Sequence, residues 1–373
     1  MGVDQYLWIS ILVRKSALLQ GWNMNDLLRS LAAAASVAIL ALSAQPSPRL
    51  ARAQSQPSQA PAAAGPETKA TQDSPETARP DPTLVTLNVL VTDEDGRVLT
   101  NLKRGNFRVL DSGSPQPILS FEPTKAPITL VMLLEYSAAT YGYFADKSAE
   151  WGSRFLDHLE PTDWVALVTF DLNSKVQVDF THKRFEVRDT LTTLGYPKFS
   201  ETNLFDSLID TLDMLDRVKG RKSILLMATG INSFSAANLD EVTRRLQKTD
   251  ATIFCVGLAE AEATQSGGSN LAYVQAKNQM SAFARQTGGI AIFPRFEGEL
   301  PGIFRSVVGY LRSEYTLTFR PPKEYRDGRY HRLKVDIVGP EGQPLKATDE
   351  KGKQRKIEVF TREGYTAMKE KTP

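Results

Sequence analysis

The sequence predicts a doubly wound α/β domain with a mostly parallel central sheet, flanked by a small β-sandwich-like module. The run Ile128–Leu134 is continuously apolar, as in a parallel strand that is buried on both faces. Between residues 127 and 311 such runs alternate with helical segments, which is typical of strand–helix–strand units. On either side, segments 83–123 and 312–366 show the period-two alternation of antiparallel strands.

The elements follow in order along the chain. We expect strands at residues 85–92, 107–110, 117–121, 128–134, 164–170, 176–180, 223–228, 251–258, 290–293, 314–319 and 330–338. We expect helices at residues 145–159, 184–194, 203–218, 239–249, 273–287 and 300–311. Segment 176–180 is expected to form a hairpin edge with the strand before it. The two outer β segments could join into one module, with the α/β domain as an insertion.

Residues 1–53 are interpreted as a leader. Arg29 precedes an apolar core at 31–42, and Ala51-Arg-Ala53 offers small residues for cleavage, the pattern of a secretory signal. The first 23 residues do not fit that pattern, so translation could start at Met24. The core is short for a permanent anchor, so we expect an exported protein (periplasmic, cell-surface or extracellular) without an integral membrane domain after cleavage.

Residues 54–82 are rich in Pro, Ala, Gln, Ser and Thr, which predicts a disordered linker, and residues 367–373 form a short tail. The net charge of +2 carries no like-charged block, so nucleic acid is not an expected partner. Cys255 is the single cysteine, which excludes an internal disulfide, and its apolar neighbours favour a buried strand position. Three histidines (His158, His182 and His331) lack metal-ligand spacing and are read as surface or packing residues.

Three loops lie where parallel strands end, which is where such folds bind ligands. They read Glu135-Tyr-Ser137-Ala-Ala139, Ser200-Glu-Thr202-Asn-Leu-Phe-Asp206 and Ala228-Thr229-Gly230. These loops resemble those of the von Willebrand factor type A domain, whose metal-ion-dependent adhesion site is Asp-x-Ser-x-Ser, then Thr, then Asp-Gly.

The resemblance covers residues 85 to 365, and it is closest to the von Willebrand A-related domain family of acidobacterial exported proteins. Supporting stretches are Val91–Val98, Asn106-Phe107, Gly220–Leu226, Ala284–Gly289, Tyr315–Pro321 and Arg362–Tyr365. The resemblance implies protein–protein contact at the carboxyl ends of the strands and no catalysis.

The expected metal site is degenerate. Glu135, Ala139 and Thr229 stand where the family has Asp, Ser and Asp, and only Ser137 and Thr202 keep the expected identity. Mg²⁺ prefers near-octahedral oxygen ligands, carboxylates above all, so the loss of a ligand and a charge predicts no cofactor. A weak Mg²⁺ site remains an alternative, with Glu201 lending a carboxylate. If the site is dead, Ser137 and Thr202 would satisfy loop backbone groups and cap the following helix.

Aromatic residues crowd the loop after the first strand of the α/β domain: Tyr136, Tyr141, Tyr143 and Phe144. Such residues are enriched at interfaces, which favours a contact surface for a protein partner. They could instead pack over the position of the lost metal.

The leading hypothesis is therefore an exported, non-catalytic, protein-binding module. A structural component of an envelope assembly that binds nothing at this site is the alternative, and a weak Mg²⁺-dependent adhesion module is another. The chain has no G-x-S-x-G elbow, no P-loop and no His beside a candidate Ser, so an enzyme is not expected. Asp206 and Asp210, at i and i+4, are read as a helix-dipole charge and a solvated surface residue.

Overall fold

The computed structural model describes residues 81, 83–122, 127–138, 140, 148–258, 271–348 and 352–369. The predicted leader and most of the predicted linker lie outside the described residues, as do Ala139 and three of the aromatic residues, Tyr141, Tyr143 and Phe144. Along the described part of the chain, no helix combines the length and apolarity needed to cross a membrane.

The α/β domain is built on a six-stranded sheet in the order β10-β9-β8-β5-β6-β7. Its strands are β5 (Ile128–Glu135), β6 (Trp164–Phe170), β7 (Ser174–Thr181), β8 (Arg221–Ala228), β9 (Thr252–Gly257) and β10 (Ala291–Ile292). All neighbours pair in parallel except β6 and β7, which form the predicted antiparallel hairpin at one edge. The strand order reverses between β5 and β8, which confirms the predicted doubly wound fold.

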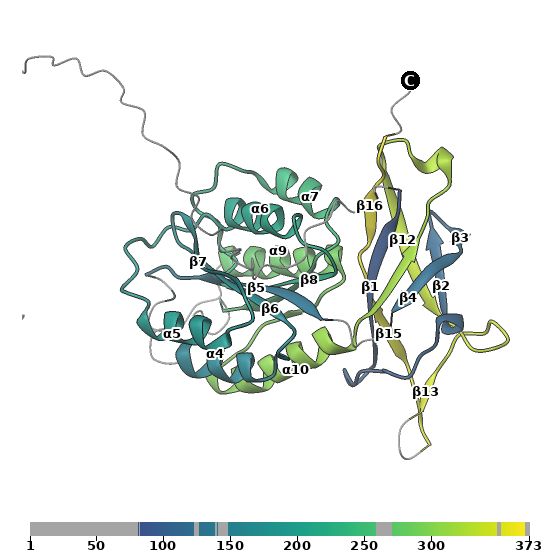
Figure 1. The fold of residues 1–373 in the computed structure, drawn as a ribbon, viewed down its shortest axis with the longest axis horizontal. Coiled ribbons are helices and arrows are strands. Elements are labelled where there is room, and N and C mark those ends of the chain that lie inside the picture. The colour runs from purple at the N-terminus through teal and green to yellow at the C-terminus, as the bar shows by residue number, and fades with distance from the viewer. Residues whose placement is uncertain are drawn as a thin grey trace, which may run out of the picture. The chain divides into compact units, whose positions relative to one another are not determined.

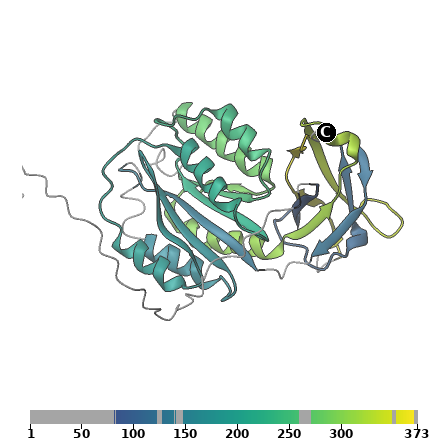
Figure 2. The same ribbon diagram turned by 45° about the horizontal axis from the view of Figure 1, so that its top comes forward.

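Helices cover both faces of this sheet (Figure 1). One face carries α4 (Ser148–Asp157), α5 (Arg184–Thr193) and α10 (Leu300–Ser313), and the other carries α6 (Leu204–Leu215), α7 (Leu239–Leu246) and α9 (Leu271–Thr287). Every residue of β5 and β8 is buried, as the continuous apolar runs predict. Figure 2 shows the twisted sheet between its two helical layers.

The second module consists of two four-stranded antiparallel sheets, β15-β1-β11-β4 and β16-β12-β2-β3. Its strands are β1 (Val85–Asp93), β2 (Phe107–Asp111), β3 (Ser114–Gln116), β4 (Ile118–Glu122), β11 (Tyr315–Phe319), β12 (Tyr330–Ile337), β15 (Ile357–Phe360) and β16 (Gly364–Thr366). β13 (Ala347–Thr348) and β14 (Gln354–Arg355) form a small hairpin. Within the described residues, the remaining elements are the 3₁₀ turns η1 (Arg104–Asn106), η2 (Glu297–Glu299) and η3 (Lys323–Tyr325).

The two outer segments of the chain do join into one β module. β1 pairs with β11, where Val85 lies opposite Phe319, and β2 pairs with β12, where Phe107 lies opposite Ile337. Inward-facing apolar residues from both sheets share one core around the buried Tyr315. The α/β domain is therefore inserted between β4 and β11, as the sequence pattern suggests.

Candidate functional site

The candidate site lies where the strand order of the α/β sheet reverses. β5 and β8 are neighbours that pair in parallel, so Glu135 at the end of β5 and Thr229 just after β8 reach the same edge. Crossover connections leave in opposite directions here, and this is the point at which such folds bind ligands. Both residues are buried, at 1% and 3% exposure.

The carboxylate of Glu135 links the two strand ends directly. Its Oε2 accepts hydrogen bonds from the backbone N–H of Thr229 (2.7 Å) and from its hydroxyl (2.8 Å). Its Oε1 accepts from the hydroxyl of Ser137 at 3.0 Å. A buried carboxylate is costly unless its oxygens find donors, and here both oxygens find them.

The turn after β5 satisfies its own polar groups. The backbone N–H of Thr140 donates to the carbonyl of Ser137 at 3.1 Å. The Thr140 hydroxyl is 3.1 Å from the carbonyl of Glu135 and accepts from the N–H of Ser137 at 3.3 Å. The Thr140 hydroxyl thus satisfies backbone groups of this turn, whereas the Ser137 hydroxyl donates to the Glu135 carboxylate and not to the loop backbone.

Thr202 belongs to the loop before α6 and is tied to the loop after β8. Its hydroxyl donates to the carbonyl of Ile231 (2.6 Å), and its N–H donates to the hydroxyl of Ser233 (2.8 Å). Its carbonyl accepts from the N–H of Ser233 (3.0 Å). The expectation that Thr202 caps the next helix is wrong, because its hydroxyl faces this neighbouring loop instead.

The first turn of α6 is capped by the same neighbouring loop. The Ser235 hydroxyl accepts from the N–H of Phe205 at 3.1 Å and lies 3.3 Å from that of Asp206. Asp206 in turn accepts from the N–H groups of Ala236 and Ala237, both at 2.8 Å. Asp206 is thus a loop-fixing residue rather than only a charge on the helix dipole.

Asp210 and Glu201 face outward. Asp210, one turn after Asp206 and exposed, accepts from the Ser174 hydroxyl at 2.8 Å. Glu201 is also exposed, and its carboxylate accepts from the N–H of Ser200 at 3.2 Å. The carboxylate that could supplement the metal site therefore lies at the surface, whereas Glu135 is buried.

As a donor set, these residues comprise one buried carboxylate and the hydroxyls of Ser137, Thr202 and Thr229. Mg²⁺ requires near-ideal octahedral geometry at about 2.1 Å and favours carboxylates. Both oxygens of Glu135 are already engaged, and the hydroxyls of Ser137 and Thr229 donate to them. Glu135, Ser137 and Thr229 thus form a hydrogen-bonded unit, which we call the latch. As arranged, these residues and Thr202 do not fit a Mg²⁺ shell.

Two exposed phenylalanines, Phe199 and Phe234, belong to loops next to the latch. Phe199 and Phe234 are 39% and 61% exposed. Their backbones are fixed, because the Phe199 carbonyl accepts from the N–H of Ala138 (2.8 Å) and the Phe234 N–H donates to the carbonyl of Thr202 (2.9 Å). Tyr136, in contrast, is half-buried, with its hydroxyl 3.4 Å from the carbonyl of Leu194.

The sequence interpretation missed Phe199 and Phe234, although each is an aromatic residue in a loop at the ends of the parallel strands. Further exposed apolar side chains follow strand ends or lead toward them at the same edge: Tyr196, Leu271, Val274 and Phe296. Exposed apolar side chains are therefore present along this edge of the sheet, where a partner could contact them.

Cys255 is fully buried in β9, as predicted, and burial raises the pKa of its thiol. His182 packs on Trp164 with ring centroids 3.6 Å apart, and His158 is exposed. These residues are the packing and surface residues that the sequence suggests.

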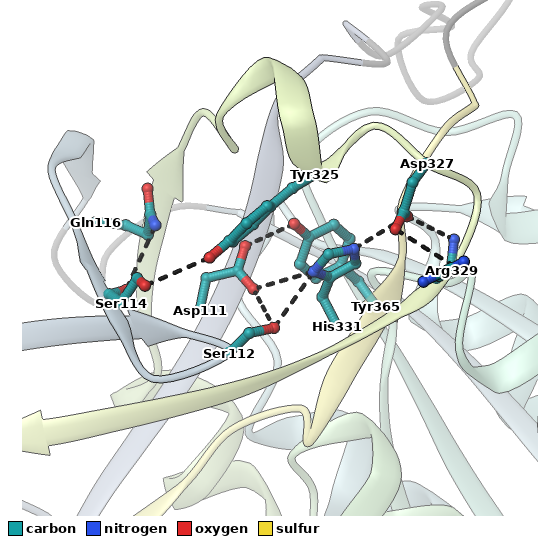
Figure 3. A network of polar contacts seen from close by, with 9 residues as sticks. All are labelled: Asp111, Ser112, Ser114, Gln116, Tyr325, Asp327, Arg329, His331 and Tyr365. Carbon is teal, nitrogen blue, oxygen red and sulfur yellow. Dashed lines mark hydrogen bonds and ion pairs between the residues drawn. The ribbon is translucent and has the colours of Figure 1, made fainter.

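His331 belongs to a polar network in the β module (Figure 3). Its Nε2 is 3.1 Å from Asp327, and its Nδ1 is 3.3 Å from the hydroxyl of Ser112 and 3.6 Å from Asp111. The buried Asp111 also accepts from the Tyr365 hydroxyl at 2.7 Å, which ties β16 to β2. The Ser112 hydroxyl is 3.2 Å from Asp111 as well, so the carboxylate competes with the imidazole for this proton.

A comparison with known protein families finds no match, and a comparison with curated proteins finds none either. Among solved structures, the conserved hypothetical protein BatB from Bacteroides thetaiotaomicron is 15% identical, with a TM-score of 0.38 over 50% of this chain and 100% of that chain. The von Willebrand domain of the pili tip protein Mfa5 from Porphyromonas gingivalis is 12% identical, with a TM-score of 0.38 over 49% and 94%. A von Willebrand factor type A protein from Catenulispora acidiphila is 11% identical, with a TM-score of 0.41 over 82% and 76%. At these identities the likeness concerns the fold alone.

Proposed function

We propose that this chain is an exported, non-catalytic module that binds another protein at the carboxyl edge of its α/β sheet, and that it does so without a metal ion. The partner presents an apolar segment, which packs against the exposed rings of Phe199 and Phe234. These two exposed aromatic residues, on backbones fixed beside the latch, are the observation that carries the proposal.

The latch supports metal independence. In an adhesion site of the von Willebrand type, a partner carboxylate would complete the shell of a bound cation. Here both carboxylate oxygens of Glu135 instead accept hydrogen bonds from Ser137 and Thr229. The loops are thereby held in place by the protein itself, and recognition falls to the side chains that surround them.

Rigid aromatic residues favour this role. Phe and Tyr offer a large contact area at a low cost in side-chain entropy, and interface hot spots are enriched in aromatic residues. Hydrogen bonds from Ala138 to Phe199 and from Phe234 to Thr202 hold the backbones of the two phenylalanines, so less freedom remains to be lost on binding.

The proposal is tested by selecting random displayed peptides on the full chain and then measuring the affinity of the recovered peptides by titration. The Phe199→Ser and Phe234→Ser double variant should weaken binding by at least about tenfold, because a hot-spot aromatic contributes ~2 kcal/mol or more.

Phe185→Ser is the matched control. Phe185 is 64% exposed and lies just after β7, which runs antiparallel to β6, so it occupies the opposite edge of the sheet. The proposal would be contradicted if the peptides bind the double variant as tightly as they bind the wild type. An equal loss of affinity in the Phe185→Ser control would also contradict it.

A further inference from the structure

A groove of about 700 Å³ lies at the opposite edge of the α/β sheet, against the β module. One wall is the outward face of β1, β11 and β4, and the other consists of the start of β8 and the loops that precede β8 and β9. This volume falls within the range of small-molecule sites, about 300 to 1,000 Å³.

Both walls are held in position by hydrogen bonds. The Asn88 amide of β1 donates to the Thr252 hydroxyl at 3.2 Å, and Thr366 donates its N–H to the Gln247 carbonyl at 3.0 Å. Arg362 adds a bond from Nη2 to the same carbonyl at 2.9 Å. The groove is therefore preformed.

The β wall carries an ordered grid of polar side chains. Strand register places Thr86 of β1 opposite Thr318 of β11, and Thr318 opposite Ser120 of β4. The next row of the grid is Asn88, Thr316 and Glu122. Neighbouring residues along each strand point into the core of the β module, so the hydroxyls of Thr86, Thr318 and Ser120 line the groove. The Asn88 amide also lines it, but it donates to Thr252 and accepts from the Thr316 hydroxyl.

On the wall formed by the start of β8 and the loops before β8 and β9, basic and acidic side chains balance one another. Lys222, at 5% side-chain exposure, forms an ion pair with Asp250 at 2.6 Å. The lining as a whole has five basic residues (Lys219, Arg221, Lys222, Lys248 and Arg362) and four acidic ones (Asp81, Glu122, Asp216 and Asp250). A groove so balanced does not select a strongly charged ligand.

We propose that this groove binds a neutral oligosaccharide. Hydroxyl side chains such as Thr86, Thr318 and Ser120 both donate and accept hydrogen bonds, which matches a ligand whose own hydroxyls do the same. An extended peptide docks by adding to a free strand edge, whereas the face of β1, β11 and β4 that lines this groove offers side chains. Leu84, Val218 and Met368 supply apolar contact for the C–H faces of sugar rings.

The test is calorimetric titration of the full chain with cello-, malto- and chito-oligosaccharides, with polygalacturonate as the charged comparison. A Thr86→Val and Thr318→Val double variant removes two hydroxyls and keeps β-branched side chains in the strands. We expect one neutral series to bind, the double variant to bind it about tenfold more weakly, and thermal unfolding to be unchanged.

Two control variants sharpen the result. Thr348→Val alters an exposed strand threonine outside the groove, and the Phe199→Ser and Phe234→Ser double variant alters the carboxyl edge; neither should change sugar affinity. The inference would be overturned if no neutral series binds, or if the chain prefers polygalacturonate. It would also be overturned if the Thr86→Val and Thr318→Val double variant binds the sugar as tightly as the wild type. Because the proposed protein-binding surface lies elsewhere, either proposal can fail alone.

Discussion

Glu135 and Thr229 lie 94 positions apart in the chain, yet one carboxylate oxygen of Glu135 holds both the backbone N–H and the hydroxyl of Thr229. This contact joins the ends of β5 and β8 at the point where the strand order reverses. It joins two of the loops that resemble those of a metal-ion-dependent adhesion site, and so it underlies the proposal of a metal-independent surface.

Replacing Glu135 by Gln should lower the free energy of unfolding by ~1–3 kcal/mol, because a buried amide cannot accept from the three donors that the carboxylate serves. Urea unfolding measures this change. Glu201→Gln is the matched control, since Glu201 is exposed, and it should stay within ~0.5 kcal/mol of the wild type. Equal stability of the Glu135→Gln variant and the wild type would show that the latch stabilises nothing.

Asp206→Ala should loosen the loop that carries Phe234. The carboxylate holds the N–H groups of Ala236 and Ala237, so amide hydrogen exchange at these two positions should accelerate by roughly five- to tenfold. Peptide affinity should fall in parallel. Asp210→Ala, one turn further along α6, removes only a bond from Ser174 and should leave both readouts unchanged. Unaltered exchange at Ala236 and Ala237 in Asp206→Ala would refute the loop-fixing role.

Glu314 should make stability depend on pH. Burial raises the pKa of this carboxyl above its ordinary 4.5, against the opposing effect of Arg221. The folded state therefore holds the proton more tightly than the unfolded state, so the contribution of Glu314 to stability falls as pH rises from 4.5 through the raised pKa. Glu314→Gln lacks this contribution, and its stability relative to the wild type should rise across that window. Urea unfolding at a series of pH values that gives parallel curves for the two proteins would exclude the effect.

His331 contacts both Ser112 and Asp327. Because serine hydrolases use a serine, a histidine and an acid in contact, hydrolysis should be tested. Asp111 competes for the Ser112 proton, and we predict no catalysis. Release of nitrophenol from p-nitrophenyl acetate should match buffer containing an inert protein, and Ser112→Ala should change nothing. A wild-type rate well above background that disappears in Ser112→Ala, but not in Ser114→Ala, would show that the chain is an enzyme.

The long elements were predictable because their apolar pattern is local. β5 and β8 are buried throughout, and their continuous apolar runs identify them without knowledge of their partners. The short strands β3, β13, β14 and β16 have two or three residues each, so pairing with a partner strand, rather than their own pattern, creates them.

The site was predictable in position but not in contacts. Doubly wound topology brings Glu135 and Thr229 to one edge, whichever rotamers they adopt. That Thr202 faces Ile231, or that Asp206 binds another loop, depends on contacts between loops that no spacing along one helix reveals. Phe199 and Phe234 were missed because exposure of a loop residue is a tertiary property.

The most direct measurement is the affinity of a selected peptide for the full chain in millimolar Mg²⁺ and again in excess EDTA. A latch made by Glu135, Ser137 and Thr229 alone predicts the same dissociation constant in both buffers, within about twofold. Loss of binding in EDTA, restored by Mg²⁺, would contradict the proposal and establish a working metal site at the ends of β5 and β8.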